Sequence, residues 1–525
     1  MTRYQMRLTK LLVLAVALTA ASDAGAKKAQ SAQQSFCRLE FYNGKRVTPS
    51  LFALKVGQRR FIVDCGLGQG GQQERAINKT LPKQALDAEA LLLTHAHIDH
   101  SGRVPMWVKQ LIESALLRKQ KIYGTEATIS VVKSLLEDSA NLQVNAVERK
   151  KKWMRRRARK LNTLDQAELE RIDQLKPLYT PQDVQATLPL LEAIKPGQLV
   201  DLGEGVSAEF SLAGHVLGAA SVTFRIKDGK HNGQVLFSGD IGRPNALITP
   251  KPTAPKGAQF VVMEGTYGGR NHPPVGDVKE TLAKVVAQTI ARGGKLIIPA
   301  FSYGRTQEVI YLLKQLQVEG RLPDVPILLD SPLAIKLTAA TRKYAKQYLN
   351  EEVKQFIAKY GDPFALPNLQ VSESVEASRE AVNHKGPAIV IAGSGMMNGG
   401  RVVHHAKAAI SDPKNAILLA GHQAEGTLGR QIELAGQAVG NAPQTVKIWG
   451  EDYKLGASVH RLKGLSGHAG QSELLGWAAK HAAEARQIFL VHGDETQLTA
   501  LSEQLTRTTG KRVSIPEANS FFELF

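Results

Sequence analysis

The stretch THAHIDHSG, Thr94 to Gly102, decides the fold because it places four metal-binding side chains within six residues. It directly follows an apolar run that is typical of a buried β-strand. Alternate residues of an extended segment point the same way, so His95 and His97 can hold one ion together. Asp99 and His100 come where the chain turns into the next helix and can reach a second ion. The spacing therefore predicts a metal site.

The ligand types indicate the metal and require further donors elsewhere in the chain. Imidazole and carboxylate without thiolate favour Zn(II), with Mn(II) or Fe(II) as alternatives. Two ions need about seven protein donors, and candidates follow predicted strands at His215, Asp240 and His492. A lone histidine at a strand end is more often structural, so the prediction depends on the whole set. Asp64 in FIVDCG is a candidate for orienting a histidine ligand, with an Asx-turn cap as the alternative.

Two patterns of strands and helices divide the chain. Residues 27–267 contain clusters of short, turn-bounded strands, and the same style returns over residues 466–525. Between them, residues 268–465 alternate strands with helices, which is typical of a parallel sheet. We therefore predict an α/β fold in which a layered sandwich carries a second, inserted α/β domain.

Residues 1–26 carry the pattern of a secretory signal peptide. Basic residues precede the apolar run LLVLAVALTA, which is too short to span a bilayer as a mature helix. A small-x-small site at Ala24 and Ala26 predicts cleavage after Ala26 and export, to the periplasm or beyond. The alternative is an apolar tail on a cytoplasmic protein. No other segment of the sequence is long and apolar enough to cross a membrane.

The net charge of +19, from 67 Lys+Arg against 48 Asp+Glu, favours polyanionic partners. Nucleic acid and an anionic membrane surface are the usual ones, and a basic surface kept for solubility is the alternative. The densest basic run is ERKKKWMRRRARK, residues 148–160. It is either a nucleic-acid patch with Trp153 as a stacking platform or the solvated face of a helix. From the sequence we favour the second interpretation.

Only two cysteines are present, Cys37 and Cys65, which excludes a cysteine metal cage. They would form a single disulfide in an oxidising compartment if their strands are neighbours. Two buried free thiols are the alternative, and the sequence leaves both open.

The metal motif and its distant partners together resemble the metallo-β-lactamase fold. MEGTYGGRNH, with Glu264, matches the acidic motif A of the β-CASP subfamily, and LSGHAGQSE, with His468, matches its motif B histidine. His492 corresponds to motif C, and IPAFSYGRTQE and AGSGMMNGGRVVHH match stretches of the β-CASP insert. Nearly the whole chain after residue 26 thus resembles RNA-processing nucleases related to the endonuclease subunit of the mRNA 3′-end cleavage factor.

The resemblance implies an αββα sandwich with an inserted parallel-sheet β-CASP domain, and it assigns the predicted ligands to two zinc ions. One ion would be held by His95, His97 and His215, the other by Asp99, His100 and His492, and Asp240 would bridge them. A hydroxide shared by the ions would attack the phosphodiester, with Asp99 and Asp240 counted among the catalytic residues. His468, oriented by Glu264, would protonate the leaving oxygen.

The inserted domain is expected to bind the RNA strand. Two turns that precede helices offer phosphate contacts, namely Ser302 with Arg305 and Ser394 with Arg401, although a plain βα turn is an equal alternative for each. RNA or another single strand would run between the domains, and cleavage would be endonucleolytic, 5′-exonucleolytic or both. Relatives also suggest a homodimer. The rival function is an exported two-zinc hydrolase of a small ester, thioester or β-lactam.

Overall fold

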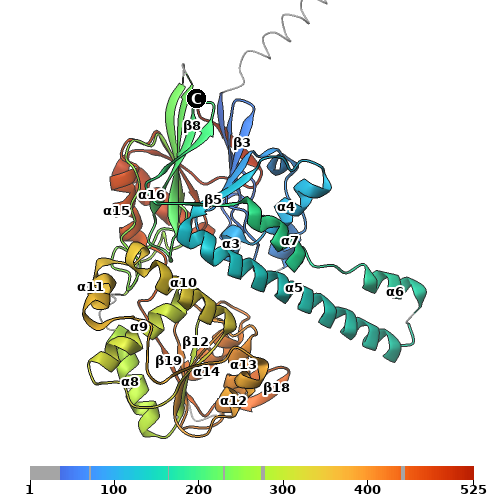
Figure 1. Ribbon diagram of the computed structural model, residues 1–525, viewed down its shortest axis with the longest axis vertical. Helices are drawn as coiled ribbons and strands as arrows, with labels where there is room; N and C mark the ends of the chain where they lie inside the picture. The colour runs from blue at the N-terminus through green and yellow to red at the C-terminus, as the bar shows by residue number, and fades with distance from the viewer. Residues whose placement is uncertain (1–35, 70–71, 164, 229–230, 274–277, 439–443) are drawn as a thin grey trace, which may run out of the picture.

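The computed structural model describes residues 36–69, 72–163, 165–228, 231–273, 278–438 and 444–525, and the predicted signal peptide lies outside these residues. Within them, two seven-stranded sheets, one six-stranded sheet and a two-stranded ribbon form the architecture (Figure 1). No helix in the described ranges has both the length and the apolar character needed to cross a bilayer.

Two sheets stack face to face. The first has the order β22-β1-β2-β3-β4-β5-β6, with the strands β1 (Cys37–Phe41), β2 (Phe52–Val56), β3 (Arg59–Val63), β4 (Ala90–Leu92), β5 (Lys121–Thr125), β6 (Leu191–Ile194) and β22 (Ser520–Glu523). The second has the order β21-β20-β11-β10-β9-β8-β7, with the strands β7 (Leu199–Gly203), β8 (Val206–Leu212), β9 (Ala220–Asp228), β10 (His231–Phe237), β11 (Phe260–Glu264), β20 (Gln487–Val491) and β21 (Arg512–Ser514). Phe41 and Phe61 of the first sheet share a buried layer with Phe224 and Phe237 of the second, because alternate strand residues point to the same face.

Helices cover the outer faces of this pair. Against the first sheet lie α4 (Val104–Glu113), α5 (Glu126–Lys160) and α7 (Pro181–Thr187). Against the second lie α15 (Gln471–His481) and α16 (Glu495–Thr509), which bury Trp477 and Leu501 on it. The layers are therefore helix, sheet, sheet and helix, and the predicted α/β class with a sandwich at its centre is confirmed.

A third sheet is inserted between β11 and α15. Its order is β14-β13-β15-β12-β16-β19 and every neighbouring pair is parallel; the strands are β12 (Lys295–Pro299), β13 (Ile327–Asp330), β14 (Leu369–Val371), β15 (Ala388–Ala392), β16 (Ala416–Leu419) and β19 (Ser458–Arg461). Its two faces are covered by α8 (Val278–Ala291), α9 (Arg305–Val318) and α10 (Pro332–Tyr348), and by α12 (Val375–Asn383), α13 (Arg401–Ala409) and α14 (Leu428–Gln437). Burial on both faces explains why β15 reads as the continuous apolar run AIVIA.

Shorter elements complete the described chain. They are α2 (Gln72–Ile77), η1 (Lys83–Asp87), α3 (Ile98–Ser101), α6 (Gln166–Asp173), η2 (Leu188–Leu190), α11 (Glu351–Tyr360), β17 (Thr445–Ile448) and β18 (Glu451–Lys454). Of these, α3 matters most for function, because it carries part of the histidine motif and begins directly after His97.

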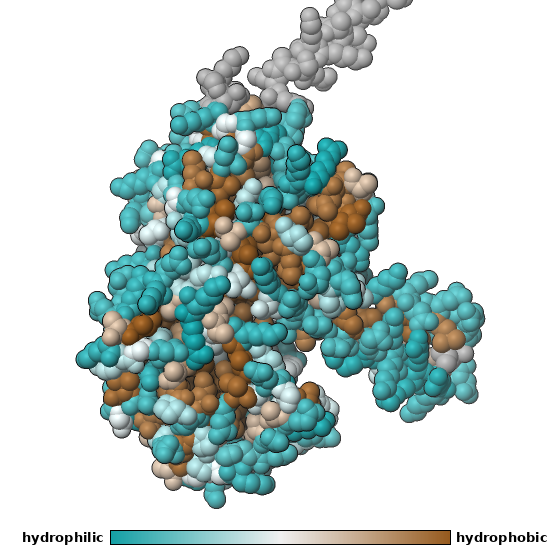
Figure 2. All heavy atoms as spheres, in the orientation of Figure 1, coloured by the Kyte–Doolittle hydropathy of each residue, from teal (hydrophilic) through white to brown (hydrophobic). Residues whose placement is uncertain are grey.

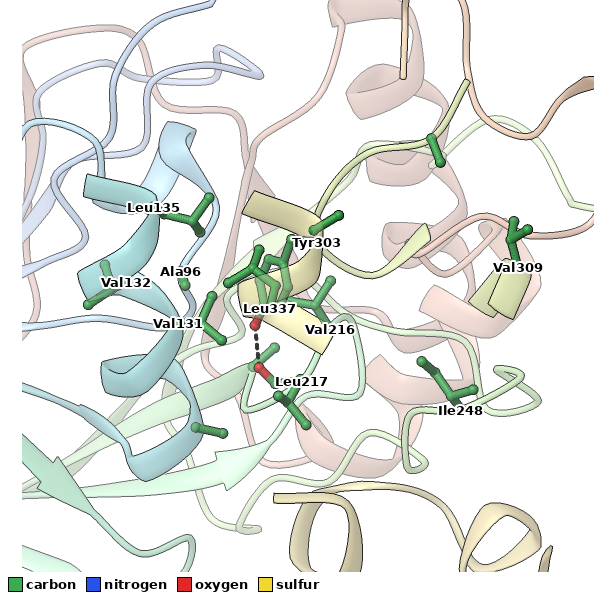
Figure 3. Close-up of a cluster of buried hydrophobic side chains, with 14 of the residues drawn as sticks. Ala96, Val131, Val132, Leu135, Val216, Leu217, Ile248, Tyr303, Val309 and Leu337 are labelled. Atoms are coloured by element: carbon green, nitrogen blue, oxygen red, sulfur yellow. Dashed lines mark hydrogen bonds between the residues drawn. The ribbon is translucent and has the colours of Figure 1, made fainter. Parts of the chain in front are cut away.

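One apolar cluster continues from the sandwich into the inserted domain (Figure 3). Val131 of α5 points toward Leu337 of α10, and Tyr303 lies close to Leu337 and to the loop that follows His215. The Tyr303 hydroxyl donates a hydrogen bond to the Leu217 carbonyl. A buried interface of this kind fixes the position of the inserted domain relative to the loop that carries His215.

The two cysteines are both buried, and no disulfide joins them. Cys37 lies in the layer between the two stacked sheets, whereas Cys65 lies in the cluster beneath α4. Burial raises the pKa of each thiol to about 12. Of the two alternatives that the sequence left open, the structure has the one without a disulfide, because the two thiols belong to different apolar layers.

Candidate metal centre and active site

Seven side chains from four separate segments converge at one end of the stacked sheets. The ligand atoms of His95, His97, His215 and Asp240 lie within 4.8 Å of one another, and so do those of Asp99, His100 and His492. The structure thus brings together every metal ligand that was predicted from the sequence. A third overlapping group, Asp240, His468 and His492, places the motif B histidine at the same centre.

In the first group, the ligand nitrogens of three histidines lie close together. His97 Nδ1 lies 3.1 Å from His95 Nε2 and 3.1 Å from His215 Nε2. Burial lowers the pKa of His95 and His215 well below 6.5 and lowers the pKa of His97 to about 4. These imidazoles are therefore neutral at pH 7, which is the form that binds a metal.

Asp240 connects the two groups through its two oxygens. Oδ2 lies 3.5 Å from Nε2 of His95 and 3.5 Å from Nε2 of His215. Oδ1 lies 3.3 Å from Nε2 of His100 and 3.6 Å from Nε2 of His492. Burial opposes the charge of Asp240, but the surrounding histidines outweigh it and hold the pKa of this carboxyl well below its usual range. The carboxylate is placed as a bridge between two cation sites.

The outward nitrogen of each buried histidine is anchored, which aims the inward nitrogen at the centre. His100 Nδ1 contacts Asp64 Oδ2 at 2.7 Å, and His492 Nδ1 contacts Ser50 Oγ at 3.3 Å. His215 Nδ1 lies 2.9 Å from the Gly467 carbonyl. Asp64 also accepts hydrogen bonds from Thr94, from the backbone N–H and from the hydroxyl, at 2.8 Å each. Asp64 therefore has the orienting position that was predicted for it.

Two buried polar atoms in this centre test whether a metal fits. Within the described residues, His100 Nε2 and Asp240 Oδ1 have no hydrogen-bond partner. Buried polar atoms in native proteins are almost always satisfied, and an unpaired buried carboxylate oxygen costs free energy. The two atoms lie 3.3 Å from each other, and a cation bound beside them would satisfy both. The residues present therefore fit a pair of metal ions.

The backbone at this centre adopts conformations that only a constrained site retains. Asp64 and His492 have φ of 59° and 54°, in the left-handed region that non-glycine residues rarely occupy. Gly239, directly before Asp240, has φ of 57°, and a Cβ there would lie 2.8 Å from the Cβ of Thr94. Close packing against the histidine motif thus requires glycine at position 239, and it sets the direction of the Asp240 side chain.

The buried Glu264 and the partly exposed His468 form a pair beside the metal centre. Glu264 Oε1 lies 3.0 Å from His468 Nδ1 and accepts the Ile241 N–H at 2.8 Å. Burial alone would lower the pKa of His468, but the charges of Glu264, Asp240 and Asp99 raise it to about 9. His468 Nε2 faces Asp240 at 3.9 Å. A protonated imidazole at the edge of a metal centre is a suitable proton donor.

The four residues predicted to bind phosphate lie at the carboxyl edge of the inserted sheet. Ser302 Oγ is 3.2 Å from Ser331 Oγ, and Ser394 donates to the Gly399 carbonyl at 3.1 Å. Both arginines are engaged within the protein: Arg305 pairs with Glu308 at 2.6 Å, and Arg401 with Asp330 at 2.8 Å. Phosphate binding at this edge stays a prediction.

Several residues at the centre were not predicted from the sequence. Ser50 and Gly467 anchor histidines that lie hundreds of positions away in the chain, and nothing in their local sequence indicates this contact. Tyr303 of the inserted domain lies edge-on to His97, with ring centroids 5.2 Å apart. Thr94 could have been identified from the sequence, because it directly precedes the first histidine of the motif.

Comparisons with known proteins agree with this arrangement. Residues 47–124 match the model of the metallo-β-lactamase superfamily, residues 306–432 match the Beta-Casp domain, and residues 452–516 match the Zn-dependent metallo-hydrolase RNA specificity domain. Ribonuclease TTHA0252 of Thermus thermophilus is 35% identical over 476 residues, which is 90% of this chain and 97% of the relative.

Two archaeal proteins are also similar along most of the chain. Transcription termination factor FttA of Methanosarcina mazei is 30% identical over 88% of this chain and 67% of its own length. An RNase J-like protein of Methanocaldococcus jannaschii is 26% identical over 90% of this chain and 96% of its own length. Because the likeness runs from the histidine motif through the inserted domain to the C-terminal strands, this chain belongs to the β-CASP nucleases of the metallo-β-lactamase superfamily and is a metal-dependent hydrolase.

Proposed function

We propose that this protein hydrolyses phosphodiester bonds of RNA at a centre of two zinc ions, leaving a 5′-phosphate and a 3′-hydroxyl. The observation that carries the proposal is the position of Asp240, whose two oxygens face two separate sets of histidines at 3.3–3.6 Å. Ribonuclease TTHA0252, at 35% identity over nearly its whole length, supports RNA as the substrate.

The chain offers each ion its own ligands. His95, His97 and His215 would hold one, Asp99, His100 and His492 the other, with Asp240 shared between them. When bound, the two ions supply an activated water as nucleophile and offset negative charge on the reacting phosphate. The hydrogen bonds that the histidines make with the Asp64 carboxylate, the Ser50 hydroxyl and the Gly467 carbonyl keep the ligands in place before substrate arrives.

The proton for the leaving 3′ oxygen would come from His468. Its Nδ1 is held by Glu264, so its Nε2 is free to face the substrate side of Asp240. Glu264 is itself fixed by the backbone N–H groups of Ile241 and Thr266, at 2.8 and 3.0 Å. The pair therefore holds one proton at a defined position, which is what general acid catalysis requires.

Strand binding would involve the carboxyl edge of the inserted sheet. The hydroxyls of Ser302 and Ser394 lie there near the starts of α9 and α13, where backbone N–H groups favour a phosphate. Arg305 and Arg401, which pair with internal carboxylates, would brace these two turns and add positive potential. The charge of +19 supports a polyanionic substrate.

The test compares RNA with a small substrate on one preparation. Purified protein of measured zinc content is assayed with labelled single-stranded RNA and, in parallel, with nitrocefin, a β-lactam. We expect RNA cleavage and no nitrocefin hydrolysis, and RNA labelled at its 5′ end or closed into a circle separates 5′-exonuclease from endonuclease action. Hydrolysis of nitrocefin without RNA cleavage would support the small-substrate alternative instead.

A control variant separates catalysis from binding. Asp99→Ala removes one predicted ligand that is half-buried, and it should abolish cleavage while RNA affinity persists. An unchanged cleavage rate in this variant would contradict the metal mechanism. Export after cleavage behind Ala26 is a separate proposal, which fractionation of expressing cells and N-terminal sequencing of the recovered protein would test.

A further inference from the structure

A long helical arm projects from the body of the molecule beside the two domains (Figure 1). It consists of the outer part of α5 and the short helix α6, which packs against it. The first half of α5 has one buried face, which ends at Ala140. The start of the helix is held to the loop that follows His215, because the hydroxyls of Thr125 and Thr128 donate hydrogen bonds to the Gly218 carbonyl at 2.6 and 2.9 Å. The arm is therefore a rigid extension of the element that supports the metal centre.

The outer end of the arm carries a dense set of cations. Residues 148–160 contain nine Lys or Arg and a single acidic residue, Glu148. At 100° per residue, one face of the helix presents what we call the cationic stripe, formed by Arg149, Lys152, Arg156 and Lys160, all of which are exposed. These positions are three or four residues apart, so neighbouring charges lie about one helical turn from each other.

The stripe is not neutralised by the protein itself. Within the described residues, Lys151 and Arg155 are the members of the run with a carboxylate inside 4.0 Å, namely Glu148 at 3.8 Å and Asp173 of α6 at 2.5 Å. Both belong to the flank that faces α6, away from the stripe. Four like charges held on one rigid face repel one another, and an anionic ligand would relieve that repulsion.

An aromatic side chain lies next to the stripe. Trp153 is 55% exposed, although it is a large apolar residue. The Arg157 guanidinium lies 5.2 Å from its ring centroid and leaves the rest of the ring open. Cations beside an exposed aromatic ring are the combination with which proteins bind single-stranded nucleic acid, because phosphates meet the charges and a base stacks on the ring.

The arm lacks the features of a membrane-binding helix. Such a helix needs a continuous apolar face opposite its basic face. Here α6 packs against the arm, where Ala158 is buried. Exposed large apolar residues on the described part of the arm are limited to Leu142, Leu161 and Trp153. The space-filling view shows mainly hydrophilic residues over the outer arm (Figure 2).

We propose that the cationic stripe and Trp153 form a second RNA-binding site, outside the metal centre, that holds single-stranded RNA entering or leaving that centre. Naming RNA as the ligand rests on the proposed function. At 1.5 Å per residue, the stripe lies roughly 35–50 Å along α5 from its buried start. At the rise of about 3.4 Å per nucleotide that one strand has in a duplex, on the order of ten nucleotides cover that distance, and a more extended single strand needs fewer. Long RNAs would therefore use both sites and short ones only the metal centre.

The test uses two full-length variants with the same change in charge. The arm variant combines Arg149→Ala, Lys152→Ala, Arg156→Ala and Lys160→Ala. The control variant combines Lys480→Ala, Arg486→Ala, Arg507→Ala and Arg512→Ala, which removes four exposed cations near α15 and α16. Affinity is measured by fluorescence anisotropy with an unstructured RNA of about thirty nucleotides and with one of about five, both at several salt concentrations.

We expect the arm variant to bind the long RNA about tenfold more weakly than the control variant, with a salt dependence lower by about three counterions. A separate Trp153→Ala variant should weaken the same binding about fivefold or more. The arm variant and the Trp153→Ala variant should both bind and cleave the short RNA like the unaltered protein. Equal affinity of the arm and control variants for long RNA would overturn the inference, whether or not the protein cleaves RNA.

Two further outcomes are informative. If neither the unaltered protein nor any variant cleaves RNA, but long RNA still binds through the arm, the proposed function would be wrong and the arm site would still be supported. Binding to phosphatidylglycerol vesicles that is lost in the arm variant, with RNA affinity unchanged, would overturn the inference in favour of a membrane contact.

Discussion

Two buried carboxylates, Asp240 in the sandwich and Asp330 in the inserted domain, each face histidine, yet their surroundings differ. Asp330 is fully satisfied: Oδ1 accepts from Arg401 at 2.8 Å, and Oδ2 contacts Ser378 and His405 at 2.8 and 2.7 Å. Asp240 has imidazole nitrogens around it at 3.3–3.6 Å, and its Oδ1 has no hydrogen-bond partner within the described residues.

This difference distinguishes a structural site from a binding site. The Asp330 cluster is complete, because each buried polar atom meets a partner of opposite character, and a complete network stabilises one conformation. In the Asp240 cluster, His100 Nε2 and Asp240 Oδ1 have no hydrogen-bond partner among the described residues, so the converging ligand atoms fit a cation. Histidine near aspartate therefore identifies neither kind of site, whereas the balance of donors and acceptors does.

The largest effect should follow from breaking the Asp240 cluster. We expect Asp240→Ala to reduce RNA cleavage on the order of a thousandfold or more, because both cation sites lose a shared ligand. Bound zinc, measured by elemental analysis, should fall with it. Asp201→Ala, which removes an exposed carboxylate on β7, is the control and should change neither. If Asp240→Ala retains its full zinc content, Asp240 is not a metal ligand and its cluster does not differ in this way from that of Asp330.

The next effect concerns proton donation by His468. We expect His468→Ala to lower the cleavage rate about a hundredfold to a thousandfold. A general acid works while protonated, so with a pKa of about 9 the rate should decline as pH rises through 9. Glu264→Gln removes the charge that raises this pKa, and the decline should begin at lower pH. The pH–rate profile checks this, and identical alkaline limbs in both proteins would contradict it.

A substitution in the Asp330 cluster should change the stability of the protein instead of its catalytic rate. Asp330→Ala leaves the Arg401 guanidinium and the buried His405 without the carboxylate they share, and we expect it to lower the free energy of unfolding by about 3 kcal/mol. Guanidinium denaturation measures this, with Asp330→Asn as the isosteric comparison. Hydrogen bonds from His405, Ser378 and Arg401 outweigh burial and lower the pKa of Asp330. Its stabilising effect is therefore present above the ordinary carboxyl pKa and is lost as pH falls through the folded value.

The smallest effect should come from the contact that links the two regions. Tyr303→Phe removes the hydrogen bond to the Leu217 carbonyl and leaves that buried acceptor unpaired, which should cost about 1 kcal/mol of unfolding free energy. Tyr360→Phe, at an exposed ring on α11, is the matched control and should be neutral. A drop in zinc affinity for Tyr303→Phe alone would show that the domain interface also positions the metal ligands.

The local part of the centre was predictable because short-range geometry fixes it. The extended segment at His95 and His97 and the helical turn at Asp99 and His100 follow from the sequence of a single motif, and their directions follow from backbone periodicity. The distant partners His215, Asp240 and His492 were predicted as a set from their positions after strands and from the family resemblance. The α/β layers followed from two patterns of strand and helix along the chain.

The sequence by itself determined which residues can bind a metal and which segments form strands. Only the tertiary structure decided that Ser50 anchors His492, that Asp330 already engages Arg401, and that Cys37 and Cys65 belong to different apolar layers. The physical reason is that these contacts join positions up to 442 residues apart. No local preference of the chain specifies such a pair, and it forms because three sheets and their helices pack in one arrangement.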